Sequence, residues 1–392
     1  MSGGLGKRGN LALLSGAIVL VLSVWFAGTA AVPALLAERA ITPARAAWLT
    51  GAVQLGFVAG TLVSAVLSLA DRLDPRRLFL GSALLASAAV TAQLFVAPAD
   101  AAALLLRCVA GAAMAGIYPV GMKLAASWAR GDLGLLIGLV VGAVALGAAL
   151  PHLLADAAAA LDWRAAYAGA AVLSACGGAM ILGFRPGPVM GARPPFNPRQ
   201  ALEAWRNKGL RLANLGYLGH MWELYAMWAW IGVFLSGVLG RPQVGVLVAG
   251  IVAIGAIGCI VVGLAADRWN RARVTALVML LSGGAALAIG PAAAVPWLAV
   301  AIAFVWGFAV IADSAQFSAC VVTLSPPDYV GTMLTVQTSL GFLLTAVTIA
   351  ALPLAMAALG PAAGFMLLGV GPLIGAVAMW RLAPMLEPRR AA

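Results

Sequence analysis

Twelve apolar stretches, separated by short polar breaks, run along this chain and limit what it can fold into. Each is about 20 residues long, the length that an α-helix needs to cross the hydrocarbon core of a bilayer. They begin near residues 11, 46, 77, 101, 133, 165, 211, 243, 273, 294, 329 and 361. With 63% hydrophobic and 9% charged residues, the chain has too little polar surface to cover soluble domains. We therefore predict an all-α integral membrane protein with 12 transmembrane helices.

A short charged motif occurs twice, half a chain apart. Leu69-Ala70-Asp71-Arg72 returns as Ala265-Ala266-Asp267-Arg268, each time after an apolar stretch. Asp267 follows Asp71 by 196 residues, half of the 392-residue chain. Internal repeats of this kind are typical of secondary transporters, which are built from two related halves. The repeat predicts two pseudo-symmetric six-helix bundles.

A long polar interruption separates the two halves. Residues 185–210 contain five prolines, which break helices, followed by a basic amphipathic segment. We predict an N-terminal six-helix bundle over residues 1–184, a cytoplasmic linker over residues 185–210 and a C-terminal six-helix bundle over residues 211–392.

The net charge of +11 indicates orientation in a membrane and not a nucleic-acid partner. If the N-terminus is cytoplasmic, 19 of the 24 lysines and arginines lie on the cytoplasmic side. The other five are Arg39, Arg45, Arg164 and Arg241 outside and Arg107 within the membrane. The positive-inside rule then places both termini in the cytoplasm. We expect a monomer in a plasma membrane of the bacterial inner-membrane type, surrounded by the lipid bilayer.

The sequence favours no metal site, cofactor or catalytic centre. The two histidines are 68 residues apart, and the chain has no G-x-x-x-x-G-K-[ST] loop for a nucleotide. The cysteines lie singly in predicted helices, without the paired spacing of a zinc site; they are Cys108, Cys176, Cys259 and Cys320. We expect a protein that is not an enzyme.

Residues 67–77 resemble the loop signature G-x-L-a-D-r-x-G-r-r of the major facilitator superfamily, and residues 263–273 resemble its second-half counterpart. The first copy has Leu67 in place of the leading glycine. Asp74 and Asn270 replace the turn glycine, and both residue types tolerate the turn conformations that glycine adopts. The resemblance implies two six-helix bundles around a central cavity that opens to alternate sides of the membrane.

The repeated motif also predicts a conformational latch. The carboxylate of Asp71 can accept hydrogen bonds from a helix N-terminus across the interface between the halves, while flanking arginines pair with it in one conformation only. We expect such a latch, formed by Asp71, Arg72, Asp267 and Arg268, to stabilise the outward-open state. The alternative is that these charges only mark short cytoplasmic loops.

Two glycine patterns resemble further signatures of the superfamily. Arg107, followed by Gly111, is similar to the R-x-x-x-G pattern whose arginine is often implicated in proton coupling. Gly138, Gly142 and the sequence up to Pro151 resemble the signature of drug:proton antiporters without its Gly-Pro core. The second pattern therefore adds little to the identification of a subfamily.

Four ionisable side chains fall inside the predicted spans: Arg107, His220, Glu223 and Asp313. Each costs on the order of 3 kcal/mol at the bilayer centre, so we expect them to face the protein interior. His220 and Glu223 are three residues apart and share one face of the seventh span, near mid-bilayer. They can form a substrate and proton site, with Asp313 as a further proton carrier. Alternatively, His220 and Glu223 only bond each other or a neighbouring helix.

Other residues can complete this site. Arg107 and Asp313 belong to opposite halves, so a bridge between them could exist in one conformation and break in the other. The predicted substrate and proton site comprises His220, Glu223, Asp313, Arg107, Trp222, Trp230, Gln316 and Gln54. Further candidates for the cavity lining are Trp25, Phe26, Tyr118 and Gln337.

These patterns predict a transporter that moves a small organic solute by alternating access, coupled to protons. One intramembrane arginine against two acids and several tryptophans suits a neutral, cationic or lipophilic solute. The alternatives are a multidrug/proton antiporter and a membrane sensor that binds a solute without transporting it.

Overall fold

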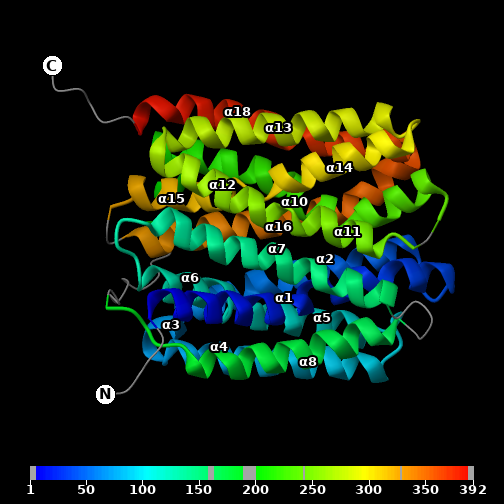
Figure 1. The fold of residues 1–392 in the computed structure, drawn as a ribbon, viewed down its shortest axis with the longest axis horizontal. Helices are drawn as coiled ribbons and strands as arrows, with labels where there is room; N and C mark the ends of the chain where they lie inside the picture. Colours follow the sequence, from blue (N-terminus) through cyan, green and yellow to red (C-terminus); the bar gives the residue numbers. More distant parts are fainter. Residues whose placement is uncertain (1–5, 158–162, 189–199, 242, 327–328, 387–392) are drawn as a thin grey trace.

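The computed structural model describes residues 6–157, 163–188, 200–241, 243–326 and 329–386, and their regular structure is helical (Figure 1). The first half of the chain contains α1 (Lys7–Ala37), α2 (Pro43–Val66), α3 (Leu69–Arg72), α4 (Pro75–Ala92), η1 (Gln93–Phe95), α5 (Ala101–Met114), α6 (Tyr118–Ala126), α7 (Leu133–Ala157), α8 (Arg164–Met180) and η2 (Ile181–Gly183). The second half contains α9 (Glu203–Arg206), α10 (Lys208–Leu239), α11 (Gly245–Ala253), α12 (Gly255–Arg268), α13 (Arg271–Ala292), α14 (Pro296–Val310), α15 (Ser314–Leu324), α16 (Val330–Leu359), α17 (Pro361–Met366), η5 (Leu367–Gly369), α18 (Val370–Leu382) and η6 (Ala383–Met385).

Twelve segments of the described chain are long and apolar enough to cross a membrane, which confirms the predicted number of spans. Each begins within four residues of its predicted start. Six of these spans are single helices, namely α1, α2, α7, α10, α13 and α16. The other six consist of more than one helix or end in a 3₁₀ turn; they are α4 with η1, α5 with α6, α8 with η2, α11 with α12, α14 with α15, and α17 through η6.

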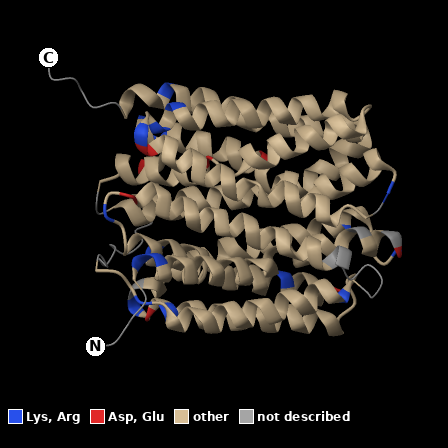
Figure 2. Cartoon of the chain, in the orientation of Figure 1, with Lys and Arg blue, Asp and Glu red and all other residues tan. Residues whose placement is uncertain are grey.

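The two halves of the chain lie side by side (Figure 1). Helices α1 to α8 occupy the lower part of the view and α10 to α18 the upper part. Across the boundary, α2 packs against α16, and α7 packs against α11 and α12. Helix α1 begins and α18 ends at the same end of the bundle, where most of the lysines and arginines of the described residues gather (Figure 2). We call this the basic end.

Each copy of the loop motif caps the helix that follows it, α4 after the first copy and α13 after the second. The Asp74 carboxylate accepts a hydrogen bond from the Arg76 amide at the start of α4, and the Asn270 side chain accepts one from the Arg273 amide at the start of α13. Their φ angles are −58° and −60°, so both residues cap a helix without a left-handed backbone conformation. Asp and Asn replace glycine here because they cap helices. The side-chain hydrogen bond from Arg76 also holds the pKa of Asp74 below its ordinary value.

Two spans are interrupted at matching positions. A three-residue turn, 115–117, separates α5 from α6, and another, 311–313, separates α14 from α15. The second turn follows the first by 196 residues, the offset of the charged motif. In both turns the backbone bonds tighten to the 3₁₀ pattern, as in Gly116 N–H to Ala113 O and Ala312 N–H to Ala309 O. Interrupted spans at equivalent places in two repeats are typical of the substrate region of transporters.

The predicted linker, residues 185–210, lies partly outside the described residues, which exclude 189–199. Its described part contains α9 and the first turn of α10, which begins at Lys208. The domain boundaries at residues 184 and 211 therefore remain a prediction.

Candidate functional site

A small cavity lies between the two halves. Its lining comes from α1, α6 and α7 in the first half and from α10, α15, α16 and the turn at 311–313 in the second. The lining residues are Leu22, Trp25, Tyr118, Val141, Val144, Tyr217, Met221, Leu224, Tyr225, Ile311, Ser314 and Phe342. Its volume of about 20 Å³ has room for about one water molecule. A larger solute can enter only after the halves move apart.

Six aromatic rings join the halves next to this cavity. They are Trp25 and Phe26 of α1, Phe57 of α2, Tyr225 and Trp228 of α10, and Phe342 of α16. The centroids of Phe57 and Phe342 are 4.4 Å apart, and those of Trp25 and Tyr225 are 5.8 Å apart. Aromatic pairs of this kind contribute about 0.5–1.5 kcal/mol each. The cluster therefore stabilises the closed arrangement of the cavity.

His220 and Asp313 form a buried pair beside the cavity. His220 Nδ1 lies 2.9 Å from Asp313 Oδ1, and the side chains are 1% and 3% exposed. The contact is an ion pair when the imidazole is protonated. Asp313 reaches His220 because it ends the turn between α14 and α15, while His220 projects from α10. The neighbouring residues Tyr217 and Ser314 line the cavity itself.

Glu223 lies one turn further along α10 and is buried. The Ser282 hydroxyl of α13 donates a hydrogen bond to Glu223 Oε1. Glu223 is also close enough to Asp313 for the two carboxyl groups to interact electrostatically. His220 and Glu223 share a face of α10, as the sequence predicted, but they do not contact each other: His220 pairs with Asp313 of the turn, and Glu223 accepts a hydrogen bond from Ser282 of α13. This region contains two carboxyl groups and one imidazole.

Arg107 is fully buried in the first half and does not meet Asp313 in this conformation. Its guanidinium group donates to the carbonyl oxygens of Val24 at 3.1 Å, Trp25 at 2.7 Å and Leu49 at 3.2 Å. These bonds tie α5 to α1 and α2. Gly28 makes room for the group, since a methyl group there would lie 3.1 Å from Arg107 Cζ. Arg107 thus holds the backbone behind the cavity-lining side chain of Trp25.

The predicted glutamines fall into two groups. Both amide atoms of Gln54 in α2 and of Gln316 in α15 are buried without a hydrogen-bond partner among the described residues. Gln337 instead donates to Asn214 Oδ1 at 3.1 Å and accepts from Ser318, which gives it a packing role. Buried amides without partners require water or a ligand. Gln54 and Gln316 therefore remain candidates for contact with water or solute.

The two predicted tryptophans do not line the cavity. The Trp222 indole donates to the carbonyl oxygen of Leu367 in η5, on the side of α10 that faces η5 and α18. The Trp230 indole is buried and donates to the carbonyl oxygen of Ile349 in α16 at 3.1 Å. Both side chains join α10 to neighbouring helices of the second half.

The second copy of the loop motif lies at the boundary between the halves. Asp267, in the last turn of α12, lies against Gly134 in the first turn of α7, and Arg271 Nη2 is 3.3 Å from its Oδ1. The Asp267 carboxylate therefore lies near the N-terminus of a helix of the other half. The side chain of Asp71 lies outside the described residues. Arg72 and Arg268 are exposed at the basic end.

Tyr217 and Met221 are cavity residues that the sequence reasoning missed. Both belong to α10, and Tyr217 lies three residues before His220 on the same face. Helical spacing could have predicted Tyr217, because it lies one turn before His220 on the same face of α10. With Tyr118 and Tyr225, Tyr217 gives a mostly apolar cavity three tyrosine side chains.

Twelve candidate spans in two halves, which enclose a cavity and buried ionisable groups, define a multispanning membrane transport protein. The sequence model of the Major Facilitator Superfamily matches residues 13–349. The chain belongs to this superfamily and is an integral membrane protein that transports a small molecule. No curated protein matches the chain.

Proposed function

We propose that this protein couples the transport of a small neutral or cationic, largely apolar solute to the movement of protons. The observation that carries the proposal is the group of His220, Asp313 and Glu223, buried beside a cavity at the boundary between the halves. It acts as a transporter and not as an enzyme. We place both termini in the cytoplasm of a bacterial inner membrane, because the basic end then obeys the positive-inside rule.

Charge balance supports a proton role for this group. Two ionised carboxyl groups next to one imidazole would leave a net negative charge in the membrane interior, which costs on the order of 3 kcal/mol. When the imidazole is protonated, a proton on Glu223 removes that charge, and the Ser282 hydroxyl still has an oxygen to bond. Separation of His220 from Asp313 would leave the Asp313 carboxylate without this partner. Movement of the halves can thus change the electrostatic surroundings of the group.

The lining of the cavity supports the proposed class of solute. Three tyrosines and Phe342 offer aromatic faces, which bind apolar groups and cations. The cavity lining has no basic side chain within the described residues, so a multiply charged anion would lack a partner.

We further propose that the halves, residues 1–184 and 211–392, rock about the cavity as a monomer. Asp267 against the first turn of α7 serves as a latch that keeps the basic end closed. Asp71, Arg72 and Arg268 are assigned to the same latch by the repeat. Release of the latch would open the cavity toward the basic end.

The test uses purified protein in liposomes that enclose a pH-sensitive dye. Pools of neutral aromatic compounds and of cationic drugs are added outside, with Glu223→Gln as the test variant and Glu203→Gln as the control. Glu203 lies in α9, outside the candidate spans, and pairs with Arg206. We expect solute-dependent proton flux in the wild type and in the control but not in Glu223→Gln. Binding of a solute without flux would indicate a sensor and overturn the proposal.

Export of drugs is the second candidate, favoured by the aromatic lining of the cavity. An exporter would raise the resistance of cells that overproduce it to cationic drugs. Unchanged resistance, together with proton-driven uptake of a metabolite, would exclude this candidate.

A further inference from the structure

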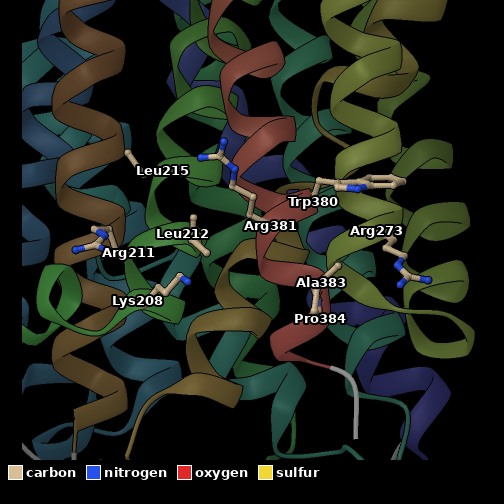
Figure 3. Close-up of a pocket in the computed structure, with 9 residues that line it drawn as sticks. All are labelled: Lys208, Arg211, Leu212, Leu215, Arg273, Trp380, Arg381, Ala383 and Pro384. Carbon is tan, nitrogen blue, oxygen red and sulfur yellow. The ribbon is translucent and has the colours of Figure 1, made fainter. Parts of the chain in front are cut away.

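A basic pocket lies apart from the cavity, at the basic end of the second half (Figure 3). Its volume of about 770 Å³ is within the range of ligand sites, about 300–1,000 Å³. The first turns of α10 and α13 and the end of α18 with η6 form it. Its lining residues are Lys208, Arg211, Leu212, Leu215, Arg273, Trp380, Arg381, Ala383 and Pro384.

The charge of this pocket has one sign. Four of its nine lining residues are Lys or Arg, and none of the nine is acidic. Arg211 uses one N–H to bond the carbonyl oxygen of Trp205, and the rest of its five donors stay available for a ligand. Figure 3 shows the Arg381 side chain leaving α18 on the side of α10. The first acidic residue after Arg381 in the sequence is Glu387, which lies outside the described residues.

Two of the apolar lining residues are exposed on candidate membrane spans. Leu215 is 39% and Trp380 55% exposed, and both belong to candidate membrane spans. Exposed apolar side chains on a span contact lipid chains, and tryptophan is favoured where the chains meet the headgroups. The pocket therefore places cations at the headgroup level directly beside surfaces for acyl chains.

We propose that this pocket binds the phosphate headgroup of an anionic phospholipid. Arginine and lysine supply charge-assisted hydrogen bonds to phosphate oxygens, and basic pockets between spans on the cytoplasmic side suit such headgroups. The acyl chains lie along Leu215 and Trp380. A soluble phosphate would fill only the charged part of the site and would leave these apolar surfaces unused.

The test measures lipid binding to the full-length protein in detergent, by native mass spectrometry and by thermal unfolding. The probes are cardiolipin, phosphatidylglycerol, phosphatidylcholine and inorganic phosphate. The test variant replaces Lys208, Arg211 and Arg381 with Gln. The control replaces Arg8, Arg77 and Arg130 with Gln, which removes three exposed charges from the first half at the same end.

We expect the wild type and the control to bind cardiolipin and phosphatidylglycerol in preference to phosphatidylcholine. The triple variant should bind cardiolipin about 100-fold more weakly, since each basic residue near an anionic headgroup contributes roughly fivefold. If the triple variant does not insert, the single variants Lys208→Gln and Arg381→Gln should each show the roughly fivefold loss.

Three results would overturn the proposal. They are equal loss of binding in the test and control variants, equal binding of phosphatidylcholine and the anionic lipids, and protection by inorganic phosphate as strong as that by cardiolipin. The last would assign the pocket to a soluble anion. The assay requires no transport, so its outcome is independent of the proposed function.

Discussion

Replacement of Gly134 by Ala tests the proposed latch at the boundary between α7 and α12. A methyl group at this position would lie 2.7 Å from Asp267 Oδ2 and 2.8 Å from its Cγ, well inside ordinary van der Waals contact. The carboxylate must therefore leave the first turn of α7. In the proposed latch the halves meet here only when the basic end is closed, so the variant should favour the open arrangement.

The size of the effect follows from the interaction that is lost. A carboxylate at a helix N-terminus contributes about 0.3–1 kcal/mol, and up to about 2 kcal/mol when partly buried. The Asp267 side chain is 31% exposed, which favours a value near 1 kcal/mol, or about a fivefold change in the ratio of closed to open molecules. Alanine also stabilises a helix relative to glycine by up to about 1 kcal/mol, but it does so in both arrangements and cancels in this ratio.

Distances between spin labels at Arg77 and Trp269, exposed positions in opposite halves, would measure this ratio. The four native cysteines are replaced first. Gly81→Ala serves as the control, since no atom lies within 4 Å of the added methyl group. If Gly134→Ala and Gly81→Ala show the same distance distribution, Asp267 does not act as a latch.

Three further predictions concern other contacts. Arg107→Gln should reduce the free energy of unfolding by about 2 kcal/mol through the loss of bonds to three carbonyl oxygens; an unchanged melting temperature would contradict this. Hydrogen bonds from the Arg130 amide and from Lys7 hold the pKa of Asp132 below its ordinary value of 3.8. The ionised carboxylate therefore stabilises the fold above pH 3.8, and this contribution disappears as the pH falls through the lowered pKa. Melting temperatures should therefore fall more steeply below about pH 4 in the wild type than in Asp132→Asn, and parallel curves would refute the assignment. Tyr217→Phe should raise the KM for solute about fivefold, because Tyr217 lines the cavity. Trp222→Phe should leave the KM unchanged, because the Trp222 indole bonds Leu367 outside the cavity. Equal effects of the two variants on KM would contradict the assignment of this cavity as the solute site.

The spans could be predicted closely because a bilayer requires a fixed length of apolar helix. The predicted starts at residues 101, 133 and 361 coincide with those of the spans in the structure. The turns at 115–117 and 311–313 could not be predicted in this way, because the chain stays apolar through most of each turn. Their equal spacing in the repeat becomes visible only when the helix ends are known.

The candidate site could be predicted in part. Helical periodicity places His220 and Glu223 on one buried face, but it cannot tell which helix packs on that face. The partners Asp313 and Ser282 come from two other spans. Tryptophans suit both lipid and cavity surfaces, so the pattern could not exclude Trp222. The role of Asp74 as a helix cap was hidden for a similar reason, since a turn and a cap both favour Asp.

The central claim is that Glu223 couples solute movement to protons, and one comparison tests it most directly. With a solute identified by the liposome assay, proton-driven accumulation and solute exchange without a pH gradient are measured for Glu223→Gln. We predict that the variant keeps exchange, because the cavity lining is intact, and loses accumulation. Accumulation that responds to the pH gradient as in the wild type would contradict the account.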